Sequence, residues 1–173
     1  MYIKIFGSIL LLISTTAIGY LKAEELKKRV VCLNELKRVM ILLQGELRFH
    51  RATLSEAFEN VSKRVEAPFS MFLAETARRI ENRNFGNFLC VWGELSDELL
   101  LYGGFQKEDK SLLEQLGRSL GYLDLTMQTE NLNLAIFQTE EAIKSAKEQK
   151  EIKGKLYRTM GVTAGAFLTL LII

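Results

Sequence analysis

Residues Lys22–Phe49 read KAEELKKRVVCLNELKRVMILLQGELRF, and an apolar residue returns every three or four positions. This spacing lines up one face of an α-helix. No proline interrupts the stretch and no glycine occurs before Gly45, so we expect the helix to be continuous with the segment before it. The face consists of Leu26, Val30, Leu33, Leu36, Met40, Leu43 and Leu47.

The segment before it, Ile5–Leu21 (IFGSILLLISTTAIGYL), contains 17 residues and no charge. A membrane-spanning helix needs about 20 apolar residues, within a range of about 17 to 25. A cleaved signal peptide has a similar pattern, but the small residues Thr15, Thr16 and Ala17 fall inside the apolar run. We therefore expect residues 1–22 to form an uncleaved transmembrane helix.

The end of the chain, Thr159–Ile173, is a second uncharged segment, of 15 residues. As a helix it is about 22 Å long, which is short for a bilayer. The sequence predicts a C-terminal membrane segment over residues 158–173. It crosses fully only if Leu156 and Tyr157 enter the interface and either the bilayer thins or the Arg158 side chain reaches out to the interface. A buried helix of a globular domain and a re-entrant or surface-lying tail are left as alternatives.

Basic residues flank both segments on the side of the intervening chain. From Lys144 to Arg158 the net charge is +4, whereas from Lys22 to Ile143 it is −3. The positive-inside rule therefore predicts a cytoplasmic middle and both termini outside. The same charges suit contact with anionic lipid headgroups. The membrane-flanking basic residues are Lys22, Lys27, Lys28, Arg29, Lys153, Lys155 and Arg158.

Residues 23–157 are predicted to form an all-α, six-helix bundle, whose first and last helices continue into the membrane segments. Thr53-Leu-Ser-Glu56 has the pattern of a capping box, and Pro68 suits the first turn of a third helix. A polar break at residues 82–87 and the pair Gly103-Gly104 mark loops. A fifth helix is expected to carry Glu108 and Asp109 in its first turn, and the last to begin near Asp124.

The candidate core of this bundle follows from the apolar positions. It comprises Leu54, Phe58, Val61, Val65, Phe69, Phe72, Leu73, Ala77, Ile80, Phe88, Val91, Trp92, Leu95, Leu99, Leu112, Leu113, Leu116, Leu120, Leu125, Leu132, Ala135, Ile136, Ala142, Ile143 and Ala146.

The sequence offers no catalytic constellation, so we expect no enzyme, no cofactor and no bound metal. The single histidine, His50, has no marked nucleophile or carboxylate partner. Cys32 and Cys90 are expected to pack as small apolar residues. A phosphate-binding GxxxxGK[ST] loop is absent, and a net charge of +2 argues against nucleic-acid binding. A cation bound by surface carboxylates is left open.

Two patterns of small residues four positions apart are candidates for close helix packing or a partner interface. Gly117–Gly121 lies in the bundle, where glycine costs a helix about 1 kcal/mol against alanine. Gly161–Gly165 lies in the tail, where GxxxG lets membrane helices approach. The full candidate set is Leu116, Gly117, Leu120, Gly121, Asp124, Gln128, Gly161 and Gly165.

Taken together, the chain resembles the stage III sporulation AB family of endospore-forming bacteria. The resemblance rests above all on LGRSLGYLD (Leu116–Asp124) followed by Gln128, and on KLYRTMGV (Lys155–Val162). It extends over Gly7, Leu10-Leu11-Leu12, Ser14, Gly19, Leu33, Leu36, Glu46, Leu54-Ser-Glu-Ala57 and Trp92. Two departures affect local helix starts: Ala52-Thr53-Leu54 replaces Thr-Pro-Leu, and Leu123-Asp124 replaces Ser-Asp.

The resemblance implies a domain similar to the cytoplasmic domain of type II secretion F proteins. It implies a scaffold in the mother-cell membrane around the forespore, within a secretion-like channel complex. The implied partners are the lipid bilayer, a secretion-type ATPase and other membrane subunits, and self-association is left open. The alternatives are a generic membrane-anchored helical adaptor and a helical domain secreted after signal cleavage.

Overall fold

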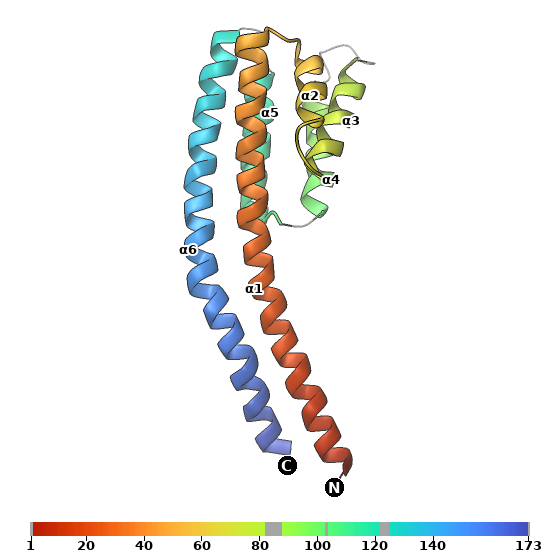
Figure 1. Cartoon of the computed structure of the whole chain (residues 1–173), viewed down its shortest axis with the longest axis vertical. Coiled ribbons are helices and arrows are strands. Elements are labelled where there is room, and N and C mark those ends of the chain that lie inside the picture. The colour runs from red at the N-terminus through yellow and green to blue at the C-terminus, as the bar shows by residue number, and fades with distance from the viewer. Residues whose placement is uncertain (1, 82–87, 103, 122–124, 173) are drawn as a thin grey trace. The chain divides into compact units, whose positions relative to one another are not determined.

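The computed structural model describes residues 2–81, 88–102, 104–121 and 125–172, except the side chains of residues 2–5, 8, 125, 171 and 172. These ranges contain six α-helices and two short helical turns, without a strand. The helices are α1 (Tyr2–Gly45), α2 (Leu54–Ser62), α3 (Phe69–Glu81), α4 (Phe88–Leu101), α5 (Lys110–Leu120) and α6 (Leu125–Ile172) (Figure 1). The predicted all-α, six-helix architecture is thus confirmed for the described part of the chain.

The chain divides into two compact units, and α1 and α6 contribute to both. The helix pair comprises Met1–Val30 and Ser145–Ile173, and the bundle comprises Val31–Lys144. Within the helix pair, the first part of α1 lies antiparallel beside the last part of α6 (Figure 1). Each unit is described below by itself.

Among the described residues, no helix combines the length and the apolar character needed to cross a membrane. The side chains of residues 5 and 8 in the first predicted membrane segment, and of residues 171–173 in the second, lie outside the described part of the chain. The membrane segments and their boundaries therefore stay predictions.

The core of the bundle forms around Trp92, a buried residue of α4. Its ring centroid lies 5.7 Å from that of Phe58, 4.8 Å from that of Phe72 and 5.7 Å from that of Phe88. These contacts join α2, α3 and α4 through aromatic packing. The apolar positions predicted within residues 23–157 are buried, except that Val30, Ile80, Ile136 and Ala142 are half-buried and Leu125 lies outside the described side chains.

The start of α2 is the predicted capping box. The Thr53 hydroxyl accepts from the Glu56 N–H at 3.3 Å, and the Glu56 carboxylate accepts from the Thr53 N–H at 2.8 Å. This reciprocal pair satisfies two donors at the helix start, so Thr53 replaces the proline that the family pattern places before this helix. The capping box is confirmed.

Two other helix starts differ from the prediction. α3 begins at Phe69, and Pro68 lies just before it, where its carbonyl accepts from the Phe72 N–H at 3.1 Å. Glu108 and Asp109 belong to a 3-10 turn, Lys107–Asp109, that precedes α5. The Asp109 carboxylate accepts from the Gln106 N–H at 2.8 Å, so this acid caps the turn before the helix. The expected start near Asp124 and the break at residues 82–87 lie outside the described residues.

The prediction for Cys90 is wrong. The buried face of α4 contains Phe88, Val91, Trp92 and Leu95, so Cys90 falls on the opposite, exposed face. Its sulfur lies 3.8 Å from the Glu94 carboxylate. Cys32 is half-buried.

The end of α1 widens into a π-helical turn, Glu46–His50, which the sequence did not predict. Arg51 closes it with a left-handed backbone (φ 50°), and its N–H donates to the Glu46 carbonyl. The Glu46 carboxylate is buried and accepts from Asn60 Nδ2 at 3.0 Å and Arg64 Nη1 at 3.2 Å. Glu46, a residue of the family pattern, thus links the turn after α1 to Asn60 of α2 and, by an ion pair, to Arg64 just after α2.

Candidate interaction surfaces

The two helices of the helix pair touch through glycines. A methyl group added to Gly19 would lie 2.5 Å from the Tyr157 carbonyl oxygen, and one added to Gly161 would lie 2.9 Å from the Thr15 carbonyl oxygen. One added to Gly165 would overlap the Thr15 hydroxyl. This glycine contact (Thr15, Gly19, Tyr157, Gly161 and Gly165) therefore keeps the two backbones close together.

The sequence prediction singled out only the α6 side of this contact. On the α1 side, Thr15 and Gly19 lie within the uncharged segment, for which the sequence analysis predicts a membrane helix and no packing contact. A signal was present, because Thr15, Gly19 and Ala23 are small residues four positions apart on one helix face.

The outward faces of the helix pair are apolar. Phe167, for example, has 67% of its surface exposed, and Ile13 has 61%. The other exposed large apolar residues of these two segments are Phe6, Ile9, Leu10, Leu12, Ile18, Tyr20, Leu21, Met160, Val162, Leu168 and Leu170. In a water-soluble helix pair the large apolar residues lie between the helices and polar residues face the solvent. Here small residues lie between the helices and large apolar residues face outward.

The hydroxyl groups on these faces bond to their own helix. Ser14 donates to the Leu10 carbonyl at 2.8 Å and Thr16 to the Leu12 carbonyl at 2.7 Å. On α6, Thr163 donates to the Thr159 carbonyl at 2.9 Å. These polar side chains thus need no water as a partner.

The predicted basic flanks have different surroundings. Lys22 and Lys27 are exposed and pair with Glu25 and Glu24 at 2.8 Å and 3.1 Å. Arg29 is buried and donates to the Gln149 side chain at 3.4 Å, which links α1 to α6. Lys28, Lys153, Lys155 and Arg158 are exposed, and the Arg158 guanidinium lies 5.5 Å from the centre of the Tyr20 ring.

In the bundle, the LGRSLG stretch packs against Trp92. A methyl group at Gly117 would overlap the indole ring, and the indole N–H donates to the Leu113 carbonyl at 2.8 Å. Leu116 and Leu120 are buried on α5, and Gly121 follows its end. The buried Gln128 of α6 donates to the Leu120 carbonyl at 2.9 Å, which ties α5 to α6. Asp124 lies outside the described residues.

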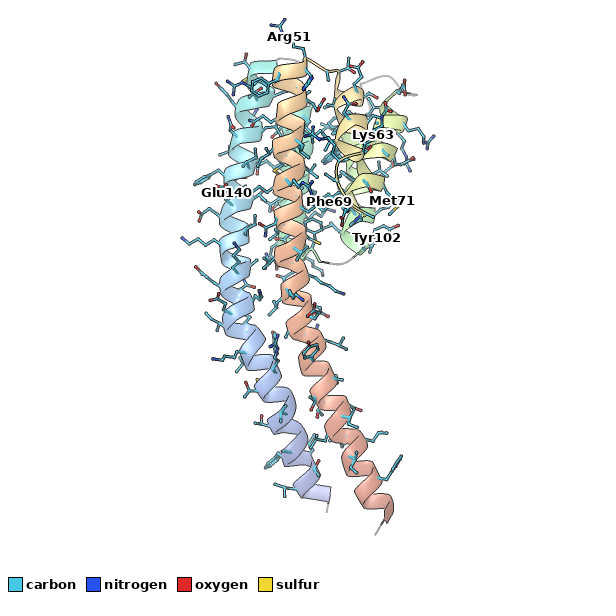
Figure 2. The ribbon with its side chains drawn as sticks, in the orientation of Figure 1. Arg51, Lys63, Phe69, Met71, Tyr102 and Glu140 are labelled. Atoms are coloured by element: carbon cyan, nitrogen blue, oxygen red, sulfur yellow. The ribbon has the colours of Figure 1, made fainter. Side chains whose placement is uncertain are left out.

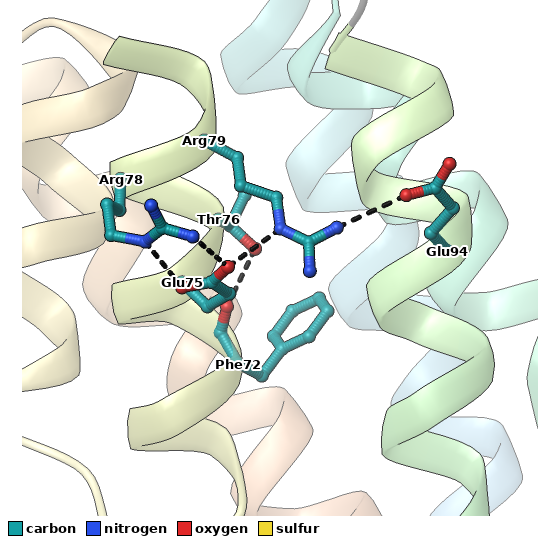
Figure 3. Close-up of polar contacts among 6 residues, drawn as sticks. All are labelled: Phe72, Glu75, Thr76, Arg78, Arg79 and Glu94. Atoms are coloured by element: carbon teal, nitrogen blue, oxygen red, sulfur yellow. Dashed lines mark hydrogen bonds and ion pairs between the residues drawn. The ribbon is translucent and has the colours of Figure 1, made fainter. Parts of the chain in front are cut away.

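A polar network joins α3 to α4 on the bundle surface. Both arginines of α3 hold one carboxylate: Arg78 donates two hydrogen bonds to Glu75, at 2.6 and 2.8 Å, and Arg79 donates one, at 2.7 Å (Figure 3). Arg79 also reaches Glu94 of α4 at 3.2 Å. The hydrogen bonds from Arg78 and then Arg79 lower the pKa of Glu75 to about 2.

Apolar side chains gather where α4 ends, beside charged ones. Leu101 has 86% of its surface exposed and Tyr102 has 68%. Met71 and Tyr102, which lie near each other in Figure 2, share the lining of a groove of about 180 Å³. Glu98 also lines this groove and, with Leu101 and Phe105, a second hollow. We call Met71, Glu98, Leu101, Tyr102 and Phe105 the α4-end surface. The sequence reasoning did not single it out.

Within the described residues, no three of the His, Cys, Asp and Glu side chains are grouped so that they could hold a metal ion.

Comparison with known proteins gives one consistent result. A family model described as Stage III sporulation protein AB (spore_III_AB) matches residues 4–173. The Stage III sporulation protein AB of Bacillus subtilis (strain 168) is 20% identical over 171 residues, which are 99% of each chain. A solved structure, Stage III sporulation protein AB (SpoIIIAB), matches with a TM-score of 0.64 and 18% identity, over 72% of this chain and 98% of that one.

Proposed function

Because the chain belongs to the stage III sporulation protein AB family, we propose that it is a non-enzymatic platform subunit of the mother-cell sporulation channel complex. The helix pair anchors it in the membrane and meets other membrane subunits. The bundle faces the cytoplasm and receives a secretion-type ATPase. It needs no cofactor or metal for this role.

The observation that carries the membrane part is the reversed packing of the helix pair. Its inner faces meet through glycines, and its outer faces expose large apolar residues such as Ile13 and Phe167. In water, a continuous exposed apolar surface of this kind is unfavourable and marks a membrane or protein contact. In a lipid bilayer the same apolar surface contacts acyl chains without a free-energy penalty, and the close approach of the two backbones stabilises the helix pair.

The basic flanks support the orientation. Lys22 and Arg158 border the two uncharged segments on the side of the bundle, where further basic residues lie, whereas Lys4 is a single charge on the other side of the first segment. By the positive-inside rule this favours a cytoplasmic bundle and both termini on the far side of the membrane. The cell membrane of a spore-forming bacterium is the location that this proposal gives the chain.

For the ATPase we propose the α4-end surface. Leu101 and Tyr102 expose a large apolar area, and tyrosine is a residue type that protein interfaces often bury at their centre. The hollow beside them is lined by Asp97, Glu98, Lys107 and Lys110, so it offers charges of both signs to a partner. Because the Leu101 side chain is exposed at the end of α4, replacing it should not disturb the core of the bundle.

The test is co-purification of the full chain with the secretion-type ATPase from detergent-solubilised membranes. We expect Leu101→Ser to reduce the recovered ATPase at least fivefold. The matched control is Phe49→Ser, because Phe49 is also highly exposed on the bundle, at 76%, but lies on the Glu46–His50 turn. Equal losses in both variants, or no complex with the parent chain, would favour the generic adaptor.

The secreted-domain alternative makes a different prediction. Cleavage after the first segment removes Thr15 and Gly19, and with them the α1 side of the glycine contact. The mass of the chain recovered from sporulating cells therefore separates the two functions, since an anchored platform keeps residues 1–22.

A further inference from the structure

A cavity of about 220 Å³ lies between α1 and α6 within the helix pair. It is lined by Ala23, Lys27, Lys150, Glu151, Gly154, Lys155 and Arg158. Neither the platform role nor the glycine contact accounts for it. We call it the basic notch.

Gly154 forms part of its wall and differs from the other glycines of the helix pair. Gly19, Gly161 and Gly165 each lie against the opposite helix, so a side chain there would collide with it. Gly154 is buried, yet a methyl group added to it would meet no atom within 4 Å. Close packing therefore does not require glycine here, although glycine weakens a helix interior. Its effect is to leave the notch open.

The charges around the notch are unbalanced. Four cationic side chains line it, and Glu151 is the one carboxylate among the lining residues. Lys27 pairs with Glu24 outside the notch at 3.1 Å, and Arg158 lies over the Tyr20 ring. Lys150 and Lys155 form no ion pair among the described residues. A hollow lined in this way suits an anionic oxygen-rich group, which binds several ammonium and guanidinium donors at once.

The position of the notch identifies the source of that group. Gly154 precedes the uncharged tail by five residues, which is about 7.5 Å of helix. The headgroup layer of one leaflet is about 5 to 7 Å thick. If the uncharged segments lie in the bilayer, as the proposed function states, the notch lies at the depth of the cytoplasmic headgroups.

We propose that the basic notch binds the phosphate group of an anionic phospholipid. Lys150, Lys155 and Arg158 donate to the phosphate oxygens, and the missing side chain of Gly154 makes room for the headgroup. The site gives the platform a preference for anionic lipid beside its cytoplasmic end.

The test uses the purified full chain in a neutral detergent, with native mass spectrometry to count bound lipid. Short-chain phosphatidylglycerol is titrated in one arm, phosphatidylcholine in a second and inorganic phosphate in a third. We expect one equivalent of phosphatidylglycerol to bind at least tenfold more tightly than phosphatidylcholine. Binding of inorganic phosphate with equal affinity would assign the notch to a free anion and overturn the lipid proposal.

Two variants with matched controls test the residues. Gly154→Leu fills the notch without changing a charge and should weaken phosphatidylglycerol binding at least fivefold. Gly7→Leu is its control, because Gly7 is also free of neighbours within 4 Å but lies far along α1. Lys155→Gln should weaken binding similarly, whereas Lys144→Gln, outside the notch, should not. Circular dichroism of each variant reports whether the helices remain intact.

Failure of this inference is distinguishable from failure of the proposed function. Co-flotation of the chain with pure phosphatidylcholine vesicles reports membrane insertion alone. Flotation without any preference for phosphatidylglycerol refutes the notch and leaves the membrane role standing. A phosphatidylglycerol affinity that Gly154→Leu does not change also refutes it.

Discussion

Gly117 of α5 lies directly against the indole ring of Trp92 on α4, and any side chain at position 117 would overlap that ring. The indole N–H meanwhile donates to the Leu113 carbonyl, one turn earlier on α5, at 2.8 Å. The Cδ1 and Nε1 atoms of the indole thus occupy the space that a side chain at position 117 would need. This explains why a glycine occurs in the middle of an α-helix.

Gly117→Ala should therefore destabilise the bundle. Overpacking of a well-filled core costs about 1 to 3 kcal/mol. Replacing glycine by alanine in a helix gains about 1 kcal/mol in helix propensity, so an overpacking cost above that value leaves a net loss of stability. Urea denaturation of the full chain in detergent measures the difference. Gly93→Ala is the matched control, since a methyl group there meets no atom within 4 Å, and it should leave the bundle as stable or slightly more stable. Equal stability of the two variants would contradict the packing account.

Gly161→Leu should separate the two helices of the helix pair, because the added side chain collides with the α1 backbone at Thr15. Spin labels at Ile18 and Val162, both on exposed faces, report the separation. We expect the distance distribution to shift to longer values and to broaden. Gly7→Leu should leave it unchanged, and an unchanged distribution in Gly161→Leu would show that the glycine contact does not hold the pair.

The helices and their buried faces were predictable, because periodic apolar positions dictate them locally. The Thr53 capping box was predictable for the same reason, since its partners are three residues apart. The glycine spacing indicates close packing at Gly117, but it does not indicate the partner. Trp92 lies 25 positions earlier, and no local pattern joins the two.

Glu75 should make stability depend on pH at the acidic end. Its pKa is about 2 in the folded protein and about 4.5 when unperturbed, so the charged form favours folding. At neutral pH, Glu75→Gln should lower the unfolding free energy by up to about 1 kcal/mol, since solvent screens these partly exposed pairs. The difference between parent and variant should shrink as pH falls from about 4.5 to about 2.

Thermal unfolding across this pH range tests the Glu75 prediction. Glu114→Gln is the control, because Glu114 pairs weakly with Arg118, at 3.7 Å on an exposed face. It should change stability little at any pH. If Glu75→Gln destabilises the protein as much near pH 2 as at neutral pH, the charge of Glu75 is not the cause of the loss of stability.

Glu46→Ala should weaken the link between the Glu46–His50 turn and the chain around the end of α2. The change removes a buried carboxylate and leaves Asn60 and Arg64 without this acceptor, at a cost of about 1 to 3 kcal/mol. Chemical denaturation measures the loss. Glu59→Ala, which removes an exposed pair with Lys63, should change stability by less than about 0.5 kcal/mol. A reversed order of the two effects would contradict this assignment.

The surfaces were less predictable than the core. Cys90 was assigned to the core because its neighbours are apolar, but the helix turns it away from Trp92. The α4-end surface could not be predicted, because Leu101 and Tyr102 continue an apolar run whose pattern is also typical of a buried core. Which residues of such a run face inward depends on where the helix ends and on what packs against it.

The central claim is that the apolar outer faces of the helix pair contact lipid. The most direct test attaches a bimane fluorophore to single cysteines at Ile13, Phe167 and Leu101, in a full chain with Cys32 and Cys90 replaced by serine, reconstituted into phospholipid vesicles. We predict that spin-labelled acyl chains quench the labels at 13 and 167 strongly and that aqueous iodide does not, whereas the label at 101 shows the reverse. Quenching of all three labels by iodide to the same extent would contradict the account.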